Sequence, residues 1–251
     1  MKDQDGDKIA RRALLALFAT GAGMLIAGCG LVKSYAPFRY RLTVEIATPQ
    51  GLRTGSCVIE VTAGEVGTTL GGASAEARGE AVAVDIAPGQ TLFVLLRSDA
   101  SYGWAAGIMS GVTPKANDLS IPREERFRAR IDAVRANHKL NVVPRWFAPR
   151  NDVDAPVTGY PIMVRFRDTR DPKTVELVDP DNLAISFGPG VTLRRITVQL
   201  TDDPVTTGID KRLGWLPHHR GQLVSATKDD PENVRKLSNV TEGDFSMGIF
   251  Q

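Results

Sequence analysis

Cysteine and histidine are scarce in this chain, and so is an excess of charge of either sign. Its 251 residues include two cysteines and three histidines, and the formal net charge is +2. A balance this even provides no basic stripe of the kind that proteins present to the phosphates of nucleic acids, so we expect no nucleic-acid partner. Two cysteines far apart and an adjacent histidine pair also give no metal-ligand spacing, so we expect neither a metal nor a cofactor.

The longest stretch without charge lies near the N-terminus, over residues 13–32. It follows Arg11 and Arg12, and a basic segment before a short apolar run is the layout of a secretory signal peptide. The uncharged stretch also has about the 20 residues that are needed to span a membrane. An uncleaved single-pass anchor is therefore the alternative to a cleaved signal peptide over residues 1–28.

The apolar run ends in Ile26-Ala27-Gly28-Cys29, which resembles the lipobox of bacterial lipoprotein precursors. The resemblance implies that Cys29 receives a diacylglycerol, that a signal peptidase cuts between Gly28 and Cys29, and that the new amino terminus is acylated. In lipoproteins of Gram-negative bacteria, an aspartate after the modified cysteine goes with retention in the inner membrane. Gly30 stands at that position here, so the resemblance implies release toward the outer membrane. The chain as a whole is similar to the uncharacterised envelope lipoproteins of Gram-negative bacteria.

Most of the remaining chain alternates apolar and polar residues, which is the pattern of half-buried β-strands. After a tether at residues 29–37, we expect a first β unit over residues 38–100 and a second over 156–251, joined by a connection at 101–155. These units predict a mainly β (α+β) protein with antiparallel β-sandwich or barrel-like architecture. Cys57 lies in an expected strand and is predicted to be a small buried residue. The expected strands are residues 38–46, 55–61, 80–86, 91–97, 161–168, 174–178, 183–187 and 191–200.

One amphipathic helix is expected near residues 122–137, in the connection between the two β units. Phe127, Ile131 and Val134 share one face at helical spacing, and arginines occupy the remaining faces. The arginines could form a surface for anionic lipid or for a partner. Acidic residues among them favour an ordinary solvated face instead.

The aromatic residues offer a weaker indication of a ligand. Trp104, Trp146 and Trp215, with Tyr102, could stack on sugar rings. Tryptophan also commonly fills a protein core, and nothing in the sequence groups these four residues. We therefore predict no carbohydrate site from them.

A segment rich in turn-forming residues, 201–221, is the strongest candidate for an interaction site. No grouping of nucleophile and base is found in the sequence, so no catalytic residue is predicted. We expect a non-enzymatic, lipid-anchored protein of the cell envelope that faces the periplasm and binds another envelope protein. The alternative is a periplasmic hydrolase or sugar-binding module that uses this segment. The candidate interaction residues are Asp202, Asp203, Trp215, His218 and His219.

Overall fold

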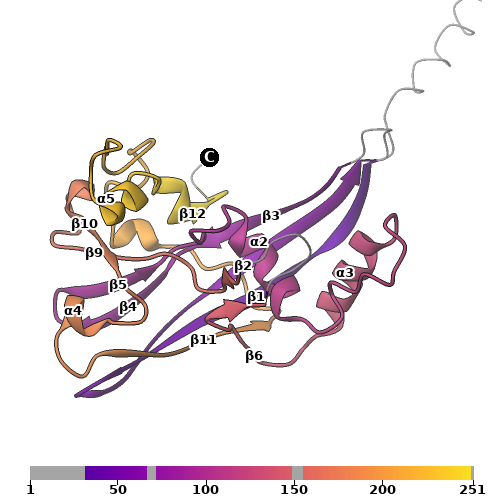
Figure 1. Cartoon of the computed structure of the whole chain (residues 1–251), viewed down its shortest axis with the longest axis horizontal. Coiled ribbons are helices and arrows are strands. Elements are labelled where there is room, and N and C mark those ends of the chain that lie inside the picture. The colour runs from indigo at the N-terminus through magenta and orange to yellow at the C-terminus, as the bar shows by residue number, and fades with distance from the viewer. Residues whose placement is uncertain (1–31, 67–71, 149–154, 250–251) are drawn as a thin grey trace, which may run out of the picture.

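A long antiparallel hairpin runs through the computed structural model, which describes residues 32–66, 72–148 and 155–249 (Figure 1). The hairpin joins β1 (Val32–Thr48) to β2 (Gly51–Val66), and Gly51 makes its turn with a φ of +111°, which favours glycine. Further strands complete a six-stranded sheet in the order β12-β3-β2-β1-β11-β6. They are β3 (Ala73–Glu80), β6 (Asn141–Val142), β11 (Thr192–Leu200) and β12 (Ser246–Met247).

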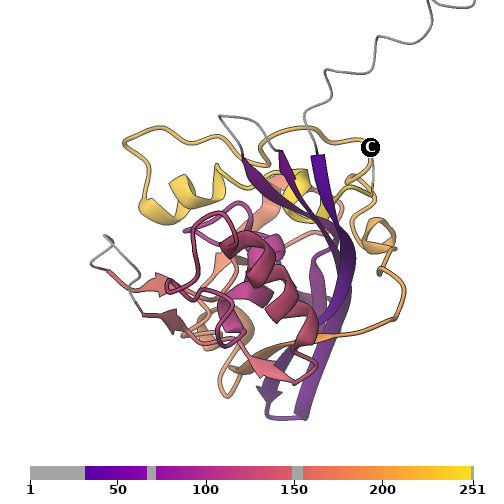
Figure 2. The ribbon, with the colours of Figure 1, turned by 90° about the vertical axis from the view of Figure 1, so that its right-hand side faces the viewer.

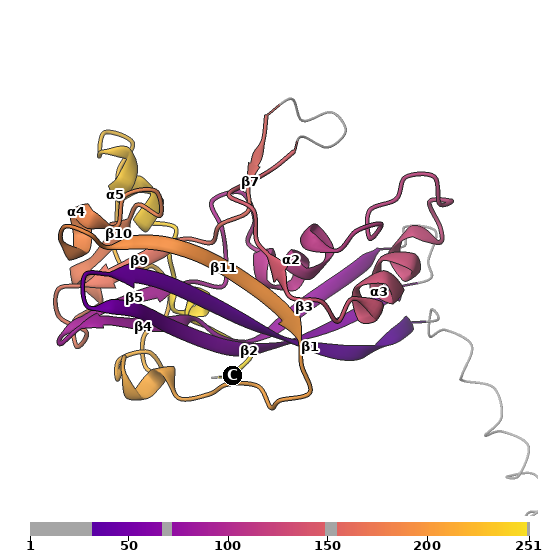
Figure 3. The ribbon, with the colours of Figure 1, turned by 90° about the horizontal axis from the view of Figure 1, so that it is seen from below.

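A second, four-stranded sheet packs across one end of this hairpin (Figure 3). Its order is β10-β9-β5-β4, and all neighbouring strands in it are antiparallel. The two sheets approach closely at Gly55 of β2, where an added Cβ would collide with the carbonyl oxygen of Ala83. Any larger residue at this crossing would push the sheets apart. The four strands are β4 (Val82–Ala87), β5 (Gln90–Val94), β9 (Met163–Phe166) and β10 (Val175–Val178).

Each sheet contains strands from both the N-terminal and the C-terminal half of the chain. β1 pairs with β11 in the large sheet, and β5 pairs with β9 in the small one. Residues between them add β6 to the large sheet and form a separate hairpin of β7 (Trp146–Phe147) with β8 (Val157–Thr158). The protein is therefore mainly β and α+β, as the alternating pattern predicts.

The first hydrophobic core lies between the two sheets and two helices, α2 (Trp104–Val112) and α3 (Arg126–Ala136). The helices cover the part of the hairpin that lies away from the small sheet (Figure 1). One direct contact is the Tyr40 hydroxyl of β1, which donates to the carbonyl oxygen of Ala105 in α2 at 2.6 Å. Alternate side chains of β1 are fully buried in this core, as expected for one face of a strand; they are Tyr40, Leu42, Val44 and Ile46.

The helix predicted near residues 122–137 is confirmed as α3. Ile131 and Val134 are buried, and Phe127 packs edge-on against Tyr35 of β1 with ring centroids 5.8 Å apart. No helix within the described ranges is long and apolar enough to cross a membrane. The shorter helices include α4 (Ala184–Phe187), α5 (Glu232–Leu237) and the 3₁₀ turns Pro172–Thr174, Ile209–Lys211 and Glu242–Asp244.

A second core lies on the other face of the four-stranded sheet and is closed by the C-terminal part of the chain. Figure 2 shows this part, in yellow, running across the top of the molecule. Phe93 and Phe166 of the sheet pack there against Leu213, Leu216 and Phe245, all of which are buried. Residues 203–249, whose sequence shows little periodicity, are therefore a full layer of the fold rather than a loose tail.

Two buried charged residues hold this layer to the sheets. The carboxylate of Glu80 accepts hydrogen bonds from the backbone N–H groups of Gly208 and Ile209, both at 3.0 Å. The guanidinium of Arg97 donates to the carbonyl oxygen of Asn239 at 2.6 Å. Both side chains are almost completely buried, so each is committed to these internal contacts.

One predicted strand is wrong, and the expected tether has a different structure. Residues 184–187 form α4 with Leu183 at its N-cap, because Leu183 and Phe187 are buried one helical turn apart while Ile185 between them is 78% exposed. Alternation would have required Ile185 to share their buried face. Of the tether expected at residues 29–37, residues 32–37 belong to β1, and Val32 to Tyr35 pair with β2 before a bulge at residues 36 and 37.

Candidate binding site

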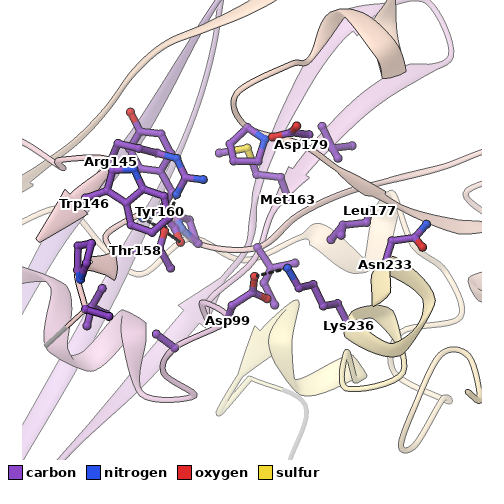
Figure 4. A pocket seen from close by; sticks show the side chains of 18 residues that line it. Asp99, Arg145, Trp146, Thr158, Tyr160, Met163, Leu177, Asp179, Asn233 and Lys236 are labelled. Atoms are coloured by element: carbon purple, nitrogen blue, oxygen red, sulfur yellow. Dashed lines mark hydrogen bonds and ion pairs between the residues drawn. The ribbon is translucent and has the colours of Figure 1, made fainter. Parts of the chain in front are cut away.

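A hollow of about 720 Å³ opens between the β7–β8 hairpin, the end of β10 and α5 (Figure 4). The hairpin contributes Trp146 and Val157, β10 contributes Leu177, and α5 contributes Asn233 and Lys236. These elements are far apart in the sequence, so the hollow exists only once both sheets and the C-terminal layer have assembled.

Exposed and buried apolar residues meet in this hollow. Trp146 is 53% exposed and Val157 is 37% exposed, on the two paired strands of the hairpin. Met163 and Val178 are buried and belong to the first core. An apolar rim above a floor of core side chains favours the burial of an apolar group from another molecule.

Arg145 is fixed in one wall of the hollow by aromatic and polar partners. Its guanidinium carbon lies 4.3 Å from the ring centre of Trp146 and 5.2 Å from that of Tyr160. Its Nε and Nη2 donate to the carboxylate of Asp181 at 2.7–3.0 Å, and Nη1 donates to the hydroxyl of Thr158 at 2.7 Å. The bound guanidinium lowers the pKa of Asp181. Arg145 therefore orients Trp146 and leaves little of its charge free for a ligand.

Lys236 in α5 provides a second cation on the opposite wall. Its Nζ lies 3.1 Å from the carboxylate of Glu232 and 3.5 Å from that of Asp99. The hydrogen bond to Glu232 is the main reason that the pKa of Lys236 is raised. The Lys236 side chain is 40% exposed, so it can also contact a molecule bound at the rim.

Trp146 is the residue of this hollow that the sequence also singles out as a candidate for stacking. The tryptophans do not form one aromatic platform, because Trp104 is buried and donates its Nε1 to the carbonyl oxygen of Gly159 at 2.9 Å. The sequence gives no signal for Val157 or Lys236, since neither stands in a recognisable motif.

Asp202 and Asp203 lie on the outer face of the six-stranded sheet, away from this hollow. Arg41 of β1 forms an ion pair with Asp203, and Arg39 donates to the backbone carbonyl oxygen of Asp203 at 2.8 Å. The hydroxyl of Thr201 donates to the Asp203 carboxylate at 2.7 Å, and this bond, together with Arg41, lowers the pKa of Asp203. In this structure Asp203 secures the chain to β1.

Trp215, His218 and His219 lie elsewhere, over the second core. The Trp215 ring packs T-shaped against Phe245 with centroids 5.9 Å apart, and His219 packs edge-on against Trp215 at 5.6 Å. No hydrogen bond or ion pair in the described part of the chain joins Asp203 to either histidine. The structure thus brings Trp215 and His219 together but keeps Asp203 apart from them.

The remaining predicted site residues, Gly28 and Cys29, lie outside the described residues. Cys57 is buried in β2, and its burial raises the pKa of the thiol. Within the described ranges, no group of three or more His, Cys, Asp or Glu residues is placed to hold a metal ion.

Comparisons of the chain with protein-family models, with curated proteins and with solved structures find no match. The N-terminal motif and the geometry of the hollow are therefore the features from which a function can be inferred.

Proposed function

We propose that this protein is a lipid-anchored component of the cell envelope that binds another envelope protein and performs no catalysis itself. The observation that carries the binding part is the exposed Trp146, held by Arg145 at the rim of an apolar hollow. Tryptophan and arginine are among the residues that contribute most to affinity when a protein interface buries them.

The hollow suits a short segment of a partner that carries an apolar side chain between polar ones. The apolar side chain would cover Met163 and Leu177 and would pack against Trp146. Lys236 at the rim is already paired with Glu232 and Asp99, so its charge sets no preference for an acidic neighbour in that segment. The 201–221 segment is a weaker candidate, because it is packed onto the second core through Leu213 and Leu216.

Lipid anchoring is tested by metabolic labelling with radioactive palmitate. We expect the wild-type protein to take up the label and to be shorter than its precursor, because the lipobox-like sequence places the modified cysteine at position 29. Cys29→Ser should abolish both the label and the cleavage, while Cys57→Ser should keep both. Unlabelled wild-type protein at full precursor length would instead support the uncleaved single-pass anchor.

Partner binding is tested by introducing a photo-crosslinking residue in living cells at Val157, on the rim of the hollow. We expect a discrete adduct with one envelope protein, and a severalfold lower yield when Trp146→Ala is also present, because that ring is the proposed anchor of the interface. The same residue placed at Leu52, which is 48% exposed at the start of β2, serves as the control. Equal adducts at both positions, or an adduct unaffected by Trp146→Ala, would argue against binding at the hollow.

A further inference from the structure

A second hollow, of about 880 Å³, concentrates positive charge. It lies between α3 and residues 111–119, the segment that follows α2. Lys115, Arg126 and Arg130 line it, and Asp118 is the one acidic residue among the described residues of its lining. Three cations against one carboxylate in the lining of one concave space attract an anion to it. Arginine in particular suits phosphate, because its planar guanidinium donates two parallel hydrogen bonds.

Among the described residues that line this hollow, Arg130 has a buried hydrogen-bond donor without an acceptor. Its side chain is half-buried, and its Nε is shielded from solvent without any hydrogen-bond partner. A shielded N–H group without an acceptor costs free energy, and native structures rarely leave one. The Nε itself is out of reach of a ligand, but the Nη groups of Arg130 form no hydrogen bond or ion pair with the described residues, so they are available to an anion in the hollow. Arg128, two residues earlier, differs because it is exposed and pairs with Asp132 at 3.6 Å.

The second cation, Arg126, is held in position by backbone carbonyl groups. Arg126 donates through Nε to the carbonyl oxygen of Ile121 at 2.7 Å and through Nη2 to that of Leu119 at 2.8 Å. These bonds tie the segment to α3. Lys115 has a φ of +64°, the one positive φ of a non-glycine residue in the described ranges. Such backbone strain is retained mainly at sites that bind ligands or carry out chemistry.

Asp118 does not cancel the charge of the site. Its Oδ1 accepts from both the backbone N–H and the hydroxyl of Ser120, at 2.9 and 2.7 Å. These bonds, with smaller contributions from Lys115 and Arg126, lower the pKa of Asp118, so it is ionised at neutral pH. One carboxylate among three cations leaves the lining with a net positive charge.

The hollow lies at the end of the molecule where β1 begins, which is the end closest in sequence to the proposed lipid anchor at Cys29. The helix α3 is attached to the N-terminal end of β1 through the Phe127–Tyr35 ring contact and a 3.1 Å hydrogen bond from Arg135 to the carbonyl oxygen of Ala36 (Figures 1 and 3). β1 begins at Val32, three residues after Cys29. Three residues span at most about 11 Å, so lipid on Cys29 would hold this end close to the headgroups.

We infer that this hollow binds a phosphate group, and that in the anchored protein the phosphate is the headgroup of an anionic membrane phospholipid. The choice of a lipid rests on the proposed anchoring at Cys29, whereas phosphate binding itself does not. Leu119 supports the lipid source, because it is 57% exposed beside the cations, as is common where a protein meets the headgroup region of a bilayer. Basic residues near the membrane surface attract anionic lipids in the same way.

The test measures binding to the full-length chain in a neutral detergent by calorimetry. The probes are short-chain phosphatidylglycerol, diacylglycerol of the same chain length without phosphate, and inorganic phosphate. We expect phosphatidylglycerol to bind, diacylglycerol not to bind, and inorganic phosphate to bind more weakly than the lipid. Arg130→Met, which keeps an unbranched apolar stem and removes the guanidinium with its charge, should weaken binding tenfold or more. Arg128→Met is the matched control and should change the affinity less than twofold.

The outcomes distinguish a phospholipid from free phosphate as the ligand, and they also show whether the site binds phosphate at all. Inorganic phosphate that binds as tightly as phosphatidylglycerol would support the phosphate site and overturn the lipid as its ligand. No binding of either phosphate probe, or equal weakening by Arg130→Met and Arg128→Met, would overturn the site. Partial rescue by Arg130→Lys would show that Arg130→Met acts through the charge rather than through misfolding. Cys29→Ser should keep the affinity, so failure of the anchor and failure of this site are separate results.

Discussion

Replacing Phe245 by alanine is expected to lower the free energy of unfolding by about 3–5 kcal/mol. Phe245 is completely buried, and its ring centroid lies 6.2 Å from that of Phe93, 5.8 Å from that of Phe166 and 5.9 Å from that of Trp215. Its removal leaves a cavity in the middle of the second core, which these rings cannot fill without leaving their preferred rotamers. Chemical unfolding followed by tryptophan fluorescence measures the loss, and Trp215 reports directly from this core.

The matched control is Ile185→Ala, because Ile185 is 78% exposed on α4. Its replacement should change the free energy of unfolding by less than about 0.5 kcal/mol. If Phe245→Ala costs no more than this control, the C-terminal layer is not part of the cooperative unit. A full effect would show that residues 203–249 fold together with the two sheets, and that the 201–221 segment is fixed in place by the core beneath it.

Strands could be predicted wherever one face is buried and the other is not. In β1, Tyr40 and Leu42 are buried while Arg39 and Arg41 lie on the opposite face, where they contact Asp203 and its backbone. The period of two in the sequence is a direct consequence of that position. The same reasoning predicts α3, whose buried residues repeat at helical spacing.

Prediction failed where the burial pattern is short or dispersed. Residues 183–187 are too few to distinguish a strand from a single helical turn, and only the exposure of Ile185 distinguishes them in the structure. β3 contains few bulky apolar residues, and its Ala75 and Ala77 give a weak signal. The second core draws on residues too widely spaced to form any period; they include Ile209, Leu213, Leu223, Leu237 and Phe245.

Neither hollow could be predicted from the sequence, because each depends on tertiary contacts. Trp146, Leu177 and Lys236 meet only through the pairing of β9 with β10 and the packing of α5. The arginines of α3 are visible in the sequence, but the charge count favours a solvated face. The lack of a partner for the Nε of Arg130 is a property of the folded chain alone.

Glu80→Gln is expected to lower the free energy of unfolding by about 1–3 kcal/mol, because one of two buried backbone N–H groups loses its acceptor. The Glu80 carboxylate accepts from both Gly208 and Ile209 and is 2% exposed. A glutamine has one acceptor oxygen, and its NH₂ group would face the other N–H. Glu76→Gln, on an exposed position of the same strand, is the matched control and should cost less than about 0.5 kcal/mol.

The cost of Glu80→Gln should also depend on pH in a direction that the structure sets. Burial raises the pKa of Glu80 above its ordinary value of 4.5, and the bonds from Ile209 and Gly208 offset this only in part. A carboxyl with a raised pKa contributes stability that is fully present below its ordinary pKa and is lost as the pH rises through the raised one. Both oxygens of Glu80 can still accept when the carboxyl is protonated, whereas glutamine keeps one acceptor and does not titrate. The difference in unfolding free energy between wild type and Glu80→Gln should therefore be largest near pH 4 and shrink as the pH rises to 8. Unfolding curves at several pH values measure it. A difference that grows with pH would mean that the two backbone hydrogen bonds outweigh burial, and that ionised Glu80 is what holds the C-terminal layer to the sheet.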